Sequence, residues 1–494
     1  MSLILAIDQS TSATKAILFD GVGRVLDKTA RDHRQIYPQS GWVEHDPDEI
    51  WANVLAAVEE LISRNSGCGG DLAALGIANQ RETILVWDRA TGRPLHNAIV
   101  WQDRRGDFIC QKLKAKGHED LVRRKTGLKI DTYFSASKLA WLMTERPEIA
   151  AGIREGGGVI GTMDSYLIHR LTAGEIFATD CTNASRTLLF DIRTLRWDEE
   201  LCELFAVPFE ALPEVRESAA HFGETNVSGI LPKQVPIIGV IGDSQASLFA
   251  QGCHEPGAAK ATFGTGTSLL LNIGGEFKLP PTGLVTALAS VWQGRPTYAM
   301  EGLINFSAAT IEWLKSQLNL IRDASEVEAL ALAVADNGGV YFVPAFSGLS
   351  APCWAPAARG AIVGMTPFTR REHIVRAALE AIAYQIRDVL DMMRADSGIA
   401  LQRLQADGGA TCNAFLMQFT ADITGVELHV ADIAESSARG AAMNGLLGLG
   451  VFTSPDDFAA LPRQCRIFKP RMYPVTARQL HDGWLAAVRK VLQT

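Results

Sequence analysis

Residues 5–20 read LAIDQSTSATKAILFD, and residues 259–271 read AKATFGTGTSLLL. Each stretch places a short turn of hydroxyl residues or glycines between two apolar runs, which is typical of two strands joined by a tight turn. The pattern occurs near the start of each half of the 494-residue chain, so it favours two related α/β domains. We place the division near residues 248–257 and expect domains 1–250 and 251–494, packed closely over a cleft.

The rest of the chain alternates short Ile, Leu and Val runs with longer helical patterns, which also indicates an α/β fold. Apolar residues recur on one face of residues 48–63, after the capping residue Asp46, and predict a helix there. We expect further strands at residues 75–78, 84–87 and 236–241, and a helix at residues 414–423.

The composition of the chain excludes several classes of function. The net charge is −8, with 47% hydrophobic and 21% charged residues, typical of a globular protein. The acidic balance argues against nucleic acid or an anionic membrane surface as the main partner. No apolar run approaches the length of a bilayer span. The eight cysteines contain no CxxC pair, and we expect reduced thiols in a cytoplasmic protein that acts on a small molecule.

The first turn has the residues that a metal-bound triphosphate needs. Asp8 ends an apolar run, the hydroxyls of Ser10 to Ser12 follow, and Lys15 lies on the returning run. Backbone N–H groups and hydroxyls can donate to phosphate oxygens, and Asp8 can position Mg²⁺ through water. An ordinary polar turn with an exposed lysine is the alternative.

Glycines mark two further turns. Gly264 and Gly266 flank Thr265, so the backbone can approach a ligand closely, although a simple hairpin would carry the same residues. Gly408 and Gly409 precede the predicted helix at 414–423 and leave a surface free of side chains that suits a base and ribose. A strand-to-helix turn with unusual backbone angles is the alternative.

Asp243 is the candidate general base. It follows the buried run 236–241, and open α/β sheets bind ligands at such strand ends. Its carboxylate could accept the proton of an attacking hydroxyl, or it could simply cap a helix that starts near Ser244.

Arg81 and Glu82 pair a donor fork with an acceptor, as a neutral polyol requires. Trp101 and Tyr133 could cover the carbon skeleton of that ligand, although Trp101 also suits the core. No P-loop is present, and the GxGxxG match at residues 156–161 opens no helix, so a dinucleotide-binding fold is not predicted.

Taken together, these residues resemble the FGGY family of carbohydrate kinases over nearly the whole chain, and most closely its members that act on glycerol. Both family signatures fit, at residues 133–145 and 360–380, and the segments 41–47, 79–83, 98–102 and 180–187 are also similar. The resemblance implies two actin-like, ribonuclease-H-like domains with the active site in the cleft between them.

The resemblance also implies roles for individual residues. It implies that Asp243 is the catalytic base, and that Asp8 and Asp243 both lie at the metal site. It implies acceptor contacts from Arg81, Glu82, Trp101, Tyr133, Asp243, Ser244 and Ser268. It implies ATP contacts from Thr11, Ser12, Lys15, Gly264, Thr265, Gly266, Ala308, Glu312, Gly409, Ala410 and Asn413.

Two departures from the family pattern concern the acceptor. Ser244 stands where glutamine is usual and Ser268 where phenylalanine is usual, so both side chains are shorter. Lost packing weakens the binding of a three-carbon ligand. The pocket could therefore admit a further hydroxymethyl group, or neighbouring groups and water could fill the gap while glycerol still binds.

We therefore expect phosphorylation of a terminal hydroxyl of a small polyol by ATP with Mg²⁺, glycerol to glycerol 3-phosphate first. Alternatives are a kinase for a tetritol, pentitol, xylulose or ribulose, and a non-catalytic or regulatory actin-like ATPase. We also expect a homo-oligomer, either a dimer or a tetramer.

Overall fold

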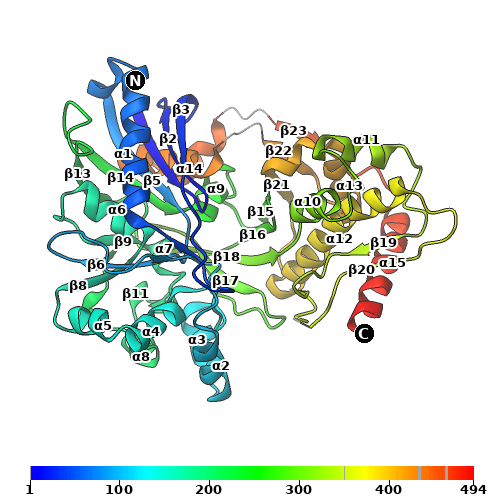
Figure 1. Ribbon diagram of the computed structural model, residues 1–494. Coiled ribbons are helices and arrows are strands. Elements are labelled where there is room, and N and C mark those ends of the chain that lie inside the picture. The colour runs from blue at the N-terminus through cyan, green and yellow to red at the C-terminus, as the bar shows by residue number, and fades with distance from the viewer. Residues whose placement is uncertain (1, 350, 356, 432–434, 462–464, 494) are drawn as a thin grey trace.

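The computed structural model describes residues 2–349, 351–355, 357–431, 435–461 and 465–493. It consists of two α/β bodies, each built on its own large sheet (Figure 1). The α/β class expected from the sequence is confirmed.

The first body contains a six-stranded sheet. Its strands, in spatial order, are β13 (His221–Thr225), β14 (Val235–Gly242), β5 (Leu72–Asn79), β1 (Leu3–Gln9), β2 (Ala13–Phe19) and β3 (Val25–Asp32). β14, β5 and β1 run parallel, so their carboxyl ends meet at one edge of the sheet. The predicted helix is α1 (Pro47–Arg64), which buries its apolar face and is capped by the Asp46 side chain.

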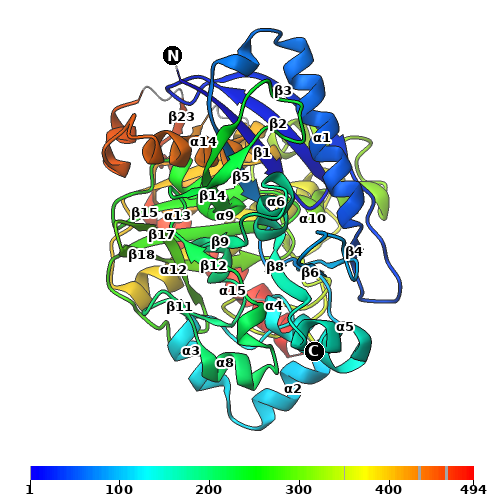
Figure 2. The ribbon, with the colours of Figure 1, turned by 90° about the vertical axis from the view of Figure 1, so that its left-hand side faces the viewer.

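A smaller sheet and several helices complete this body. The sheet has the order β4 (Glu44–His45), β7 (Ala98–Ile99), β6 (Ile84–Asp88) and β8 (Gly158–Thr162). Five helices lie together at one end of the body (Figure 2): α2 (Asp107–Ala115), α3 (Glu119–Thr126), α4 (Ser135–Glu145), α5 (Pro147–Arg154) and α8 (Glu199–Leu204). Nearer the main sheet lie α6 (Met163–Leu171), α7 (Cys181–Ala184) and α9 (Asp243–Ala250), with the short strands β9 (Ala178–Asp180), β10 (Phe190–Asp191), β11 (Arg196–Trp197) and β12 (Glu214–Arg216).

The second body contains a seven-stranded sheet. Its order is β17 (Val285–Trp292), β18 (Arg295–Ile304), β16 (Thr267–Gly274), β15 (Ala258–Phe263), β21 (Arg403–Asp407), β22 (Leu428–Ala431) and β23 (Cys465–Phe468). Its helices are α10 (Ala308–Ser316), α11 (Val327–Leu332), α12 (Arg371–Ser397), α13 (Ala414–Thr424) and α15 (Pro474–Leu492), beside the two-stranded pair β19 (Tyr341–Val343) and β20 (Ala361–Val363).

The two large sheets repeat one topology. β1 pairs antiparallel with β2 and parallel with β5, just as β15 pairs antiparallel with β16 and parallel with β21. The two motifs that open the sequence analysis are therefore equivalent strand–turn–strand units, one in each body.

Helix α14 (Ser436–Gly448) returns from the second half of the chain to the first body, where it packs on β14, β5 and β1 (Figure 1). The close approach of α14 to β14 and α9 requires glycine at two positions. A Cβ at Gly239, whose φ is +94°, would lie 2.2 Å from the Ala441 carbonyl oxygen, and a Cβ at Gly440 would lie 2.1 Å from that of Ala246. The expected domains 1–250 and 251–494 assign α14 to the second domain, whereas α14 packs on the sheet of the first body.

Candidate functional site

The predicted catalytic residues lie at the carboxyl ends of the parallel strands of the first sheet. Asp8 lies near the end of β1, Arg81 and Glu82 follow β5, and Asp243 follows β14. The strand register places Asn79 of β5 opposite both Gln9 and Gly242. The topology therefore brings these distant segments to one edge, where α/β sheets bind their ligands.

Asp243 is the first residue of α9, and Gly242 is the N-cap of that helix. Its Oδ1 accepts the Ser244 backbone N–H at 2.6 Å and lies 3.3 Å from Nε of Arg81. The Asp243 side chain is 37% exposed, in contrast to the buried charges around it. It is thus oriented by two contacts while remaining accessible to a ligand.

Four fully buried charges lie behind Asp243. Arg81 pairs with Glu301 at 3.0 Å, and Arg186 pairs with Glu301 at 2.6 Å and with Glu82 at 2.5 Å. Burial opposes ionisation of Glu301, but Arg186 and Arg81 outweigh it and lower the pKa of that carboxyl to about 2. Glu301 belongs to β18 of the second body, so this charged cluster joins the two bodies.

The backbone at Glu82 is strained, because its φ of +62° lies in the left-handed region that residues with a Cβ rarely adopt. Such strain persists where the surrounding structure imposes it, and it concentrates at functional sites. Here the neighbouring Arg186 fixes the carboxylate of Glu82, and the Ser135 hydroxyl donates to its carbonyl at 2.8 Å.

Trp101 and Tyr133 form an aromatic wall in the same region, with ring centroids 5.4 Å apart. Both residues are half-buried, so Trp101 is not simply a core residue. Its indole Nε1 donates to the Thr11 hydroxyl at 2.9 Å. The aromatic wall is thereby tied to the β1–β2 turn, where Ser12 is exposed.

A cavity of about 420 Å³ lies between the β1–β2 unit and the start of α14. Asp8 and Lys15 line it, together with Asp407 and Glu435. Nζ of Lys15 lies 2.5 Å from Glu435 and 3.9 Å from Asp8. Burial raises the pKa of Asp8 to about 7, aided by Glu435 and Asp243 and opposed by Lys15.

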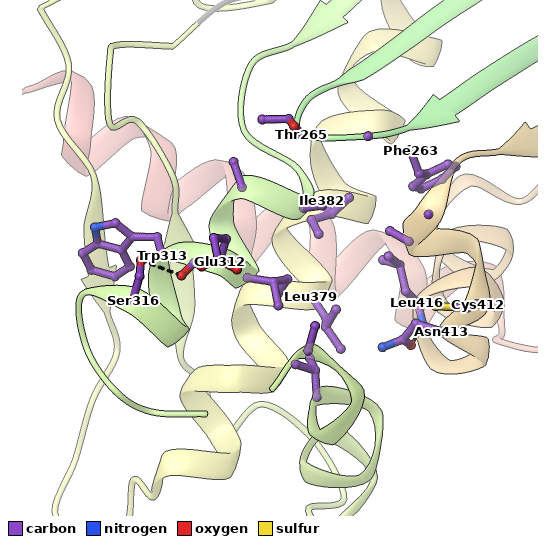
Figure 3. A pocket seen from close by; sticks show the side chains of 18 of the residues that line it. Phe263, Thr265, Glu312, Trp313, Ser316, Leu379, Ile382, Cys412, Asn413 and Leu416 are labelled. Carbon is purple, nitrogen blue, oxygen red and sulfur yellow. Dashed lines mark hydrogen bonds between the residues drawn. The ribbon is translucent and has the colours of Figure 1, made fainter. Parts of the chain in front are cut away.

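A larger cavity of about 810 Å³ lies in the second body, between α10, α12 and α13 (Figure 3). Its lining includes the predicted residues Gly264, Thr265, Ala308, Glu312, Gly409, Ala410 and Asn413. Apolar side chains such as Leu379, Ile382 and Leu416 cover much of the rest. An apolar pocket with a few polar groups is typical of a small-molecule site.

Gly266 does not line this cavity, but its position still requires glycine. A Cβ there would lie 2.4 Å from the Ile304 carbonyl oxygen. The glycine therefore allows the β15–β16 turn to pack against the end of β18.

Ser244 and Ser268 differ in their surroundings. Ser244 contributes its backbone N–H to Asp243. Ser268 lies on β16 directly opposite Leu303 of β18. Its hydroxyl is buried and has no hydrogen-bond partner among the residues that the structure describes.

Sequence reasoning missed four charged residues of the site. Arg186 belongs to a segment noted for family resemblance, and Asp407 directly precedes the Gly408–Gly409 turn, but Glu301 and Glu435 carried no local signal. Glu301, Asp407 and Glu435 all come from the second half of the chain, and the tertiary fold brings them to the cleft.

Comparison with known proteins identifies the family. The N-terminal and C-terminal domain profiles of the FGGY family of carbohydrate kinases match residues 3–250 and 259–449. The chain belongs to this family. A glycerol kinase of Rhodospirillum rubrum is 47% identical over 491 residues, or 99% of each chain. One of Stenotrophomonas maltophilia is 47% identical over 489 residues, covering 99% of this chain and 98% of that one.

Solved structures of two kinases agree with the fold. The structure of Plasmodium falciparum glycerol kinase with ADP matches with a TM-score of 0.94 and 39% identity, covering 100% of this chain and 98% of that one. A ligand-bound xylulose kinase from Lactobacillus acidophilus matches with a TM-score of 0.89 at 22% identity, covering 100% and 99% of the two chains, and shares the fold. The two-domain, actin-like architecture expected from the sequence is confirmed.

Proposed function

We propose that this FGGY kinase transfers the γ-phosphoryl group of ATP to a terminal hydroxyl of glycerol, giving glycerol 3-phosphate and ADP. The observation that carries the proposal is the position of Asp243. It lies at the carboxyl end of β14, accessible and held by Arg81, at the edge where Asp8 also lies. The full-length relatives that are glycerol kinases support the choice of acceptor.

The nucleotide would occupy the two cavities. The base and ribose suit the larger one, where Gly409 and Ala410 expose backbone and Asn413 offers an amide. Thr265 and the Gly264–Gly266 turn would face the phosphates from the second body, and Thr11, Ser12 and Lys15 from the first. Two turns that converge on one triphosphate explain why the strand–turn–strand unit occurs twice.

The donor set near Asp8 fits Mg²⁺. This ion keeps several waters and binds proteins through one or two carboxylates together with substrate phosphates. Asp8 and Asp243 are carboxylates of this kind, and a bound cation would oppose the burial that, with Glu435 and Asp243, raises the pKa of Asp8. When bound, Mg²⁺ would neutralise charge on the phosphate oxygens.

Asp243 would act as general base. The acceptor hydroxyl oxygen attacks the γ-phosphorus and forms a new P–O bond, while the bond from phosphorus to the β,γ-bridging oxygen breaks and ADP leaves. The hydroxyl proton passes to the Asp243 carboxylate. Lys15 and the turn N–H groups stabilise the transferring charge.

The remaining groups would orient the acceptor. Arg81 and Glu82 can bind neighbouring hydroxyls as donor and acceptor, and Trp101 and Tyr133 can cover the carbons. Holding the hydroxyl in line with the phosphate supplies much of the rate, and covering the site limits the hydrolysis of ATP by water.

The test is ADP release by the purified protein with Mg-ATP, with and without glycerol. Glycerol-dependent ADP release and formation of glycerol 3-phosphate support the proposal. ADP release that no acceptor stimulates would favour the regulatory ATPase instead. Asp243→Asn serves as the negative control, since it lacks the base.

We also propose that the protein is cytoplasmic, that its substrates are small molecules rather than nucleic acid, and that it assembles as a dimer or tetramer. The location rests on the cysteine pattern, and the choice of small-molecule substrates over nucleic acid rests on the acidic charge. None of the described helices is long and apolar enough to cross a membrane. Light scattering of the purified protein measures the assembly state.

A further inference from the structure

Lys260 is a buried lysine on β15 that has no part in the phosphoryl transfer described so far. It is 1% exposed. Its Nζ donates to the Thr262 hydroxyl at 2.8 Å, and it forms no ion pair within 4.0 Å in the part of the chain that the structure describes. Burying a charge is costly unless the charge is paired. A bound anion would supply the missing counter-charge.

Thr262 occupies the position in the second body that Asp8 occupies in the first. Each residue lies one position before the end of the first strand of its strand–turn–strand unit. Asp8 pairs with Lys15 on the returning strand. Thr262 pairs in the same way with Ser268. Because Asp8 and Thr262 both line the cavity of about 420 Å³, the two units present equivalent residues to one cavity.

This cavity has an excess of negative charge. Among the described residues that line it, Lys15 is the one cation, whereas three are carboxylates: Asp8, Asp407 and Glu435. A triphosphate adds further negative charge, which a single ammonium group matches poorly. Lys260 supplies a second cation to the same cavity through Thr262.

The charge of Lys260 acts at the reacting end of the cleft. Burial lowers the pKa of Lys260, whereas the carboxylates of Asp407 and Asp243 raise it. The ammonium group is therefore within electrostatic range of Asp243, the proposed base. A phosphoryl group that approaches an acceptor hydroxyl held by this base lies within the same range.

The bond from Lys260 fixes the direction of the Thr262 hydroxyl. An ammonium group can only donate, so the hydroxyl oxygen is the acceptor and its own hydrogen points elsewhere. No described residue accepts that hydrogen. Asp407 lies opposite Thr262 on β21, but its carboxylate accepts hydrogen bonds from the hydroxyls of two serines, Ser247 and Ser436. A cationic neighbour also polarises the O–H group and strengthens it as a donor.

We propose that Thr262 is a further catalytic residue, whose hydroxyl donates to an oxygen of the phosphoryl group that ATP transfers. Lys260 is the positioning residue that orients and polarises this hydroxyl. Donors that are fixed before the reaction stabilise the charge that develops in the transition state. The pair acts from the second body, opposite Asp8 and Lys15 of the first. This inference deepens the proposed kinase function and rests on it.

The first test compares two variants of Thr262. Thr262→Val keeps the shape of the side chain but loses the hydroxyl, and Thr262→Ser keeps the hydroxyl. We expect Thr262→Val to lower kcat for glycerol phosphorylation roughly tenfold or more, as for the loss of a hydrogen bond to a charged group. The Kd for ADP, which lacks the transferred group, should change less than about twofold, because the contact is made to that group alone. Thr262→Ser should restore most of kcat.

Thr267→Val is the matched control. Thr267 is a buried threonine of the neighbouring strand β16 and lines neither nucleotide cavity. The control variant should keep the wild-type kcat. A loss of kcat in Thr262→Val that Thr262→Ser does not restore, or that Thr267→Val reproduces, would overturn the catalytic role of the hydroxyl.

The second test concerns Lys260. Lys260→Met removes the ammonium group, and we expect kcat to fall roughly tenfold with little change in the Kd for ADP. If Lys260 acts through Thr262, the double variant Lys260→Met/Thr262→Val is no slower than the slower single variant, because coupled residues are not additive. A double variant whose loss equals the product of the two single losses would overturn the positioning role. Lys116→Met, at an exposed lysine, is the control. If Lys260→Met does not fold, Lys260→Gln replaces it in the same comparison.

A binding measurement separates this inference from the kinase proposal. Calorimetry gives the ratio of the Kd for ADP to the Kd for β,γ-imido ATP, an analogue that keeps the terminal phosphoryl group and is not cleaved. If the wild type phosphorylates glycerol and Thr262→Val keeps its kcat, the inference is overturned and the kinase stands. If the wild type phosphorylates no acceptor, the ratio decides. A ratio that falls by about threefold or more in Thr262→Val supports the contact, and an unchanged ratio overturns it.

Discussion

Replacing Glu301 by glutamine removes one of the two carboxylates from the buried charged cluster. The wild-type protein balances Arg81 and Arg186 against Glu82 and Glu301, and all four side chains are at most 4% exposed. In Glu301→Gln the two guanidinium groups remain charged, because arginine does not lose its proton in proteins. The buried cluster then holds two guanidinium groups against one buried carboxylate, and the partly exposed Asp243 is the remaining counter-charge beside Arg81.

The expected cost follows from that imbalance. Breaking a buried ion pair by removing one partner costs about 3–5 kcal/mol. Glutamine keeps one hydrogen-bond acceptor for the arginines, so we expect a value near the lower end, about 3 kcal/mol. For a domain of this size that corresponds to a fall of roughly 6 °C in the unfolding midpoint. Because Arg81 also contacts Asp243, kcat/KM should fall as well.

Thermal unfolding followed by circular dichroism measures the effect, with the exposed Glu276→Gln as matched control. The pH dependence adds a second check. The pKa of Glu301 is lowered to about 2 from 4.5, so its stabilisation is complete above pH 4.5 and is lost as the pH falls through about 2. The difference in unfolding free energy between the wild type and Glu301→Gln should therefore stay constant between pH 7 and 5. If Glu301→Gln has the same unfolding midpoint and the same kcat/KM as the wild type, this account of the cluster is refuted.

Three further predictions concern the cleft. Asp243→Asn should lower kcat by about 10²–10⁴-fold, the contribution of a general base, while the Kd for ATP measured by calorimetry changes less than twofold; a variant with near-normal kcat would exclude Asp243 as the base. Glu435→Gln removes a negative charge beside the phosphate cavity and frees Lys15, so we expect ATP to bind about fivefold more tightly, and weaker binding would contradict this. Burial lowers the pKa of Lys129 to about 8 from 10.5, so this amine loses its proton at lower pH than an ordinary lysine. At pH 8 its neutral fraction is roughly a hundredfold larger, and mass spectrometry should find that an acylating reagent modifies Lys129 before Lys116; modification of Lys116 first would contradict this.

The grouping of Asp8 and Asp243 at one edge of the sheet could be predicted from sequence, because both residues follow recognisable strands. Asp8 and Asp243 each end an apolar run, and parallel strands place their carboxyl ends at one edge. The predicted strands and the helix α1 formed for the same reason, since their apolar spacing matches the burial that the structure shows.

The residues that join the two bodies could not be predicted in this way. Glu301 is a single carboxylate within the ten-residue strand β18, and nothing in the neighbouring sequence indicates that it faces two arginines from the first body. Glu435 reaches Lys15 because α14 crosses back to the first sheet. Both placements depend on tertiary packing between segments hundreds of residues apart, on which hydrophobic periodicity carries no information.

The two serines show why a missing side chain must be placed in space before it can be interpreted. In sequence, Ser244 and Ser268 look alike, as short residues where the family has longer ones. In the structure, Ser244 supports Asp243 through its backbone, and that contact does not depend on its side chain. Ser268 shares a face of the sheet with Leu303, and its buried hydroxyl has no hydrogen-bond partner among the described residues. Any change in acceptor specificity should therefore follow Ser268 rather than Ser244.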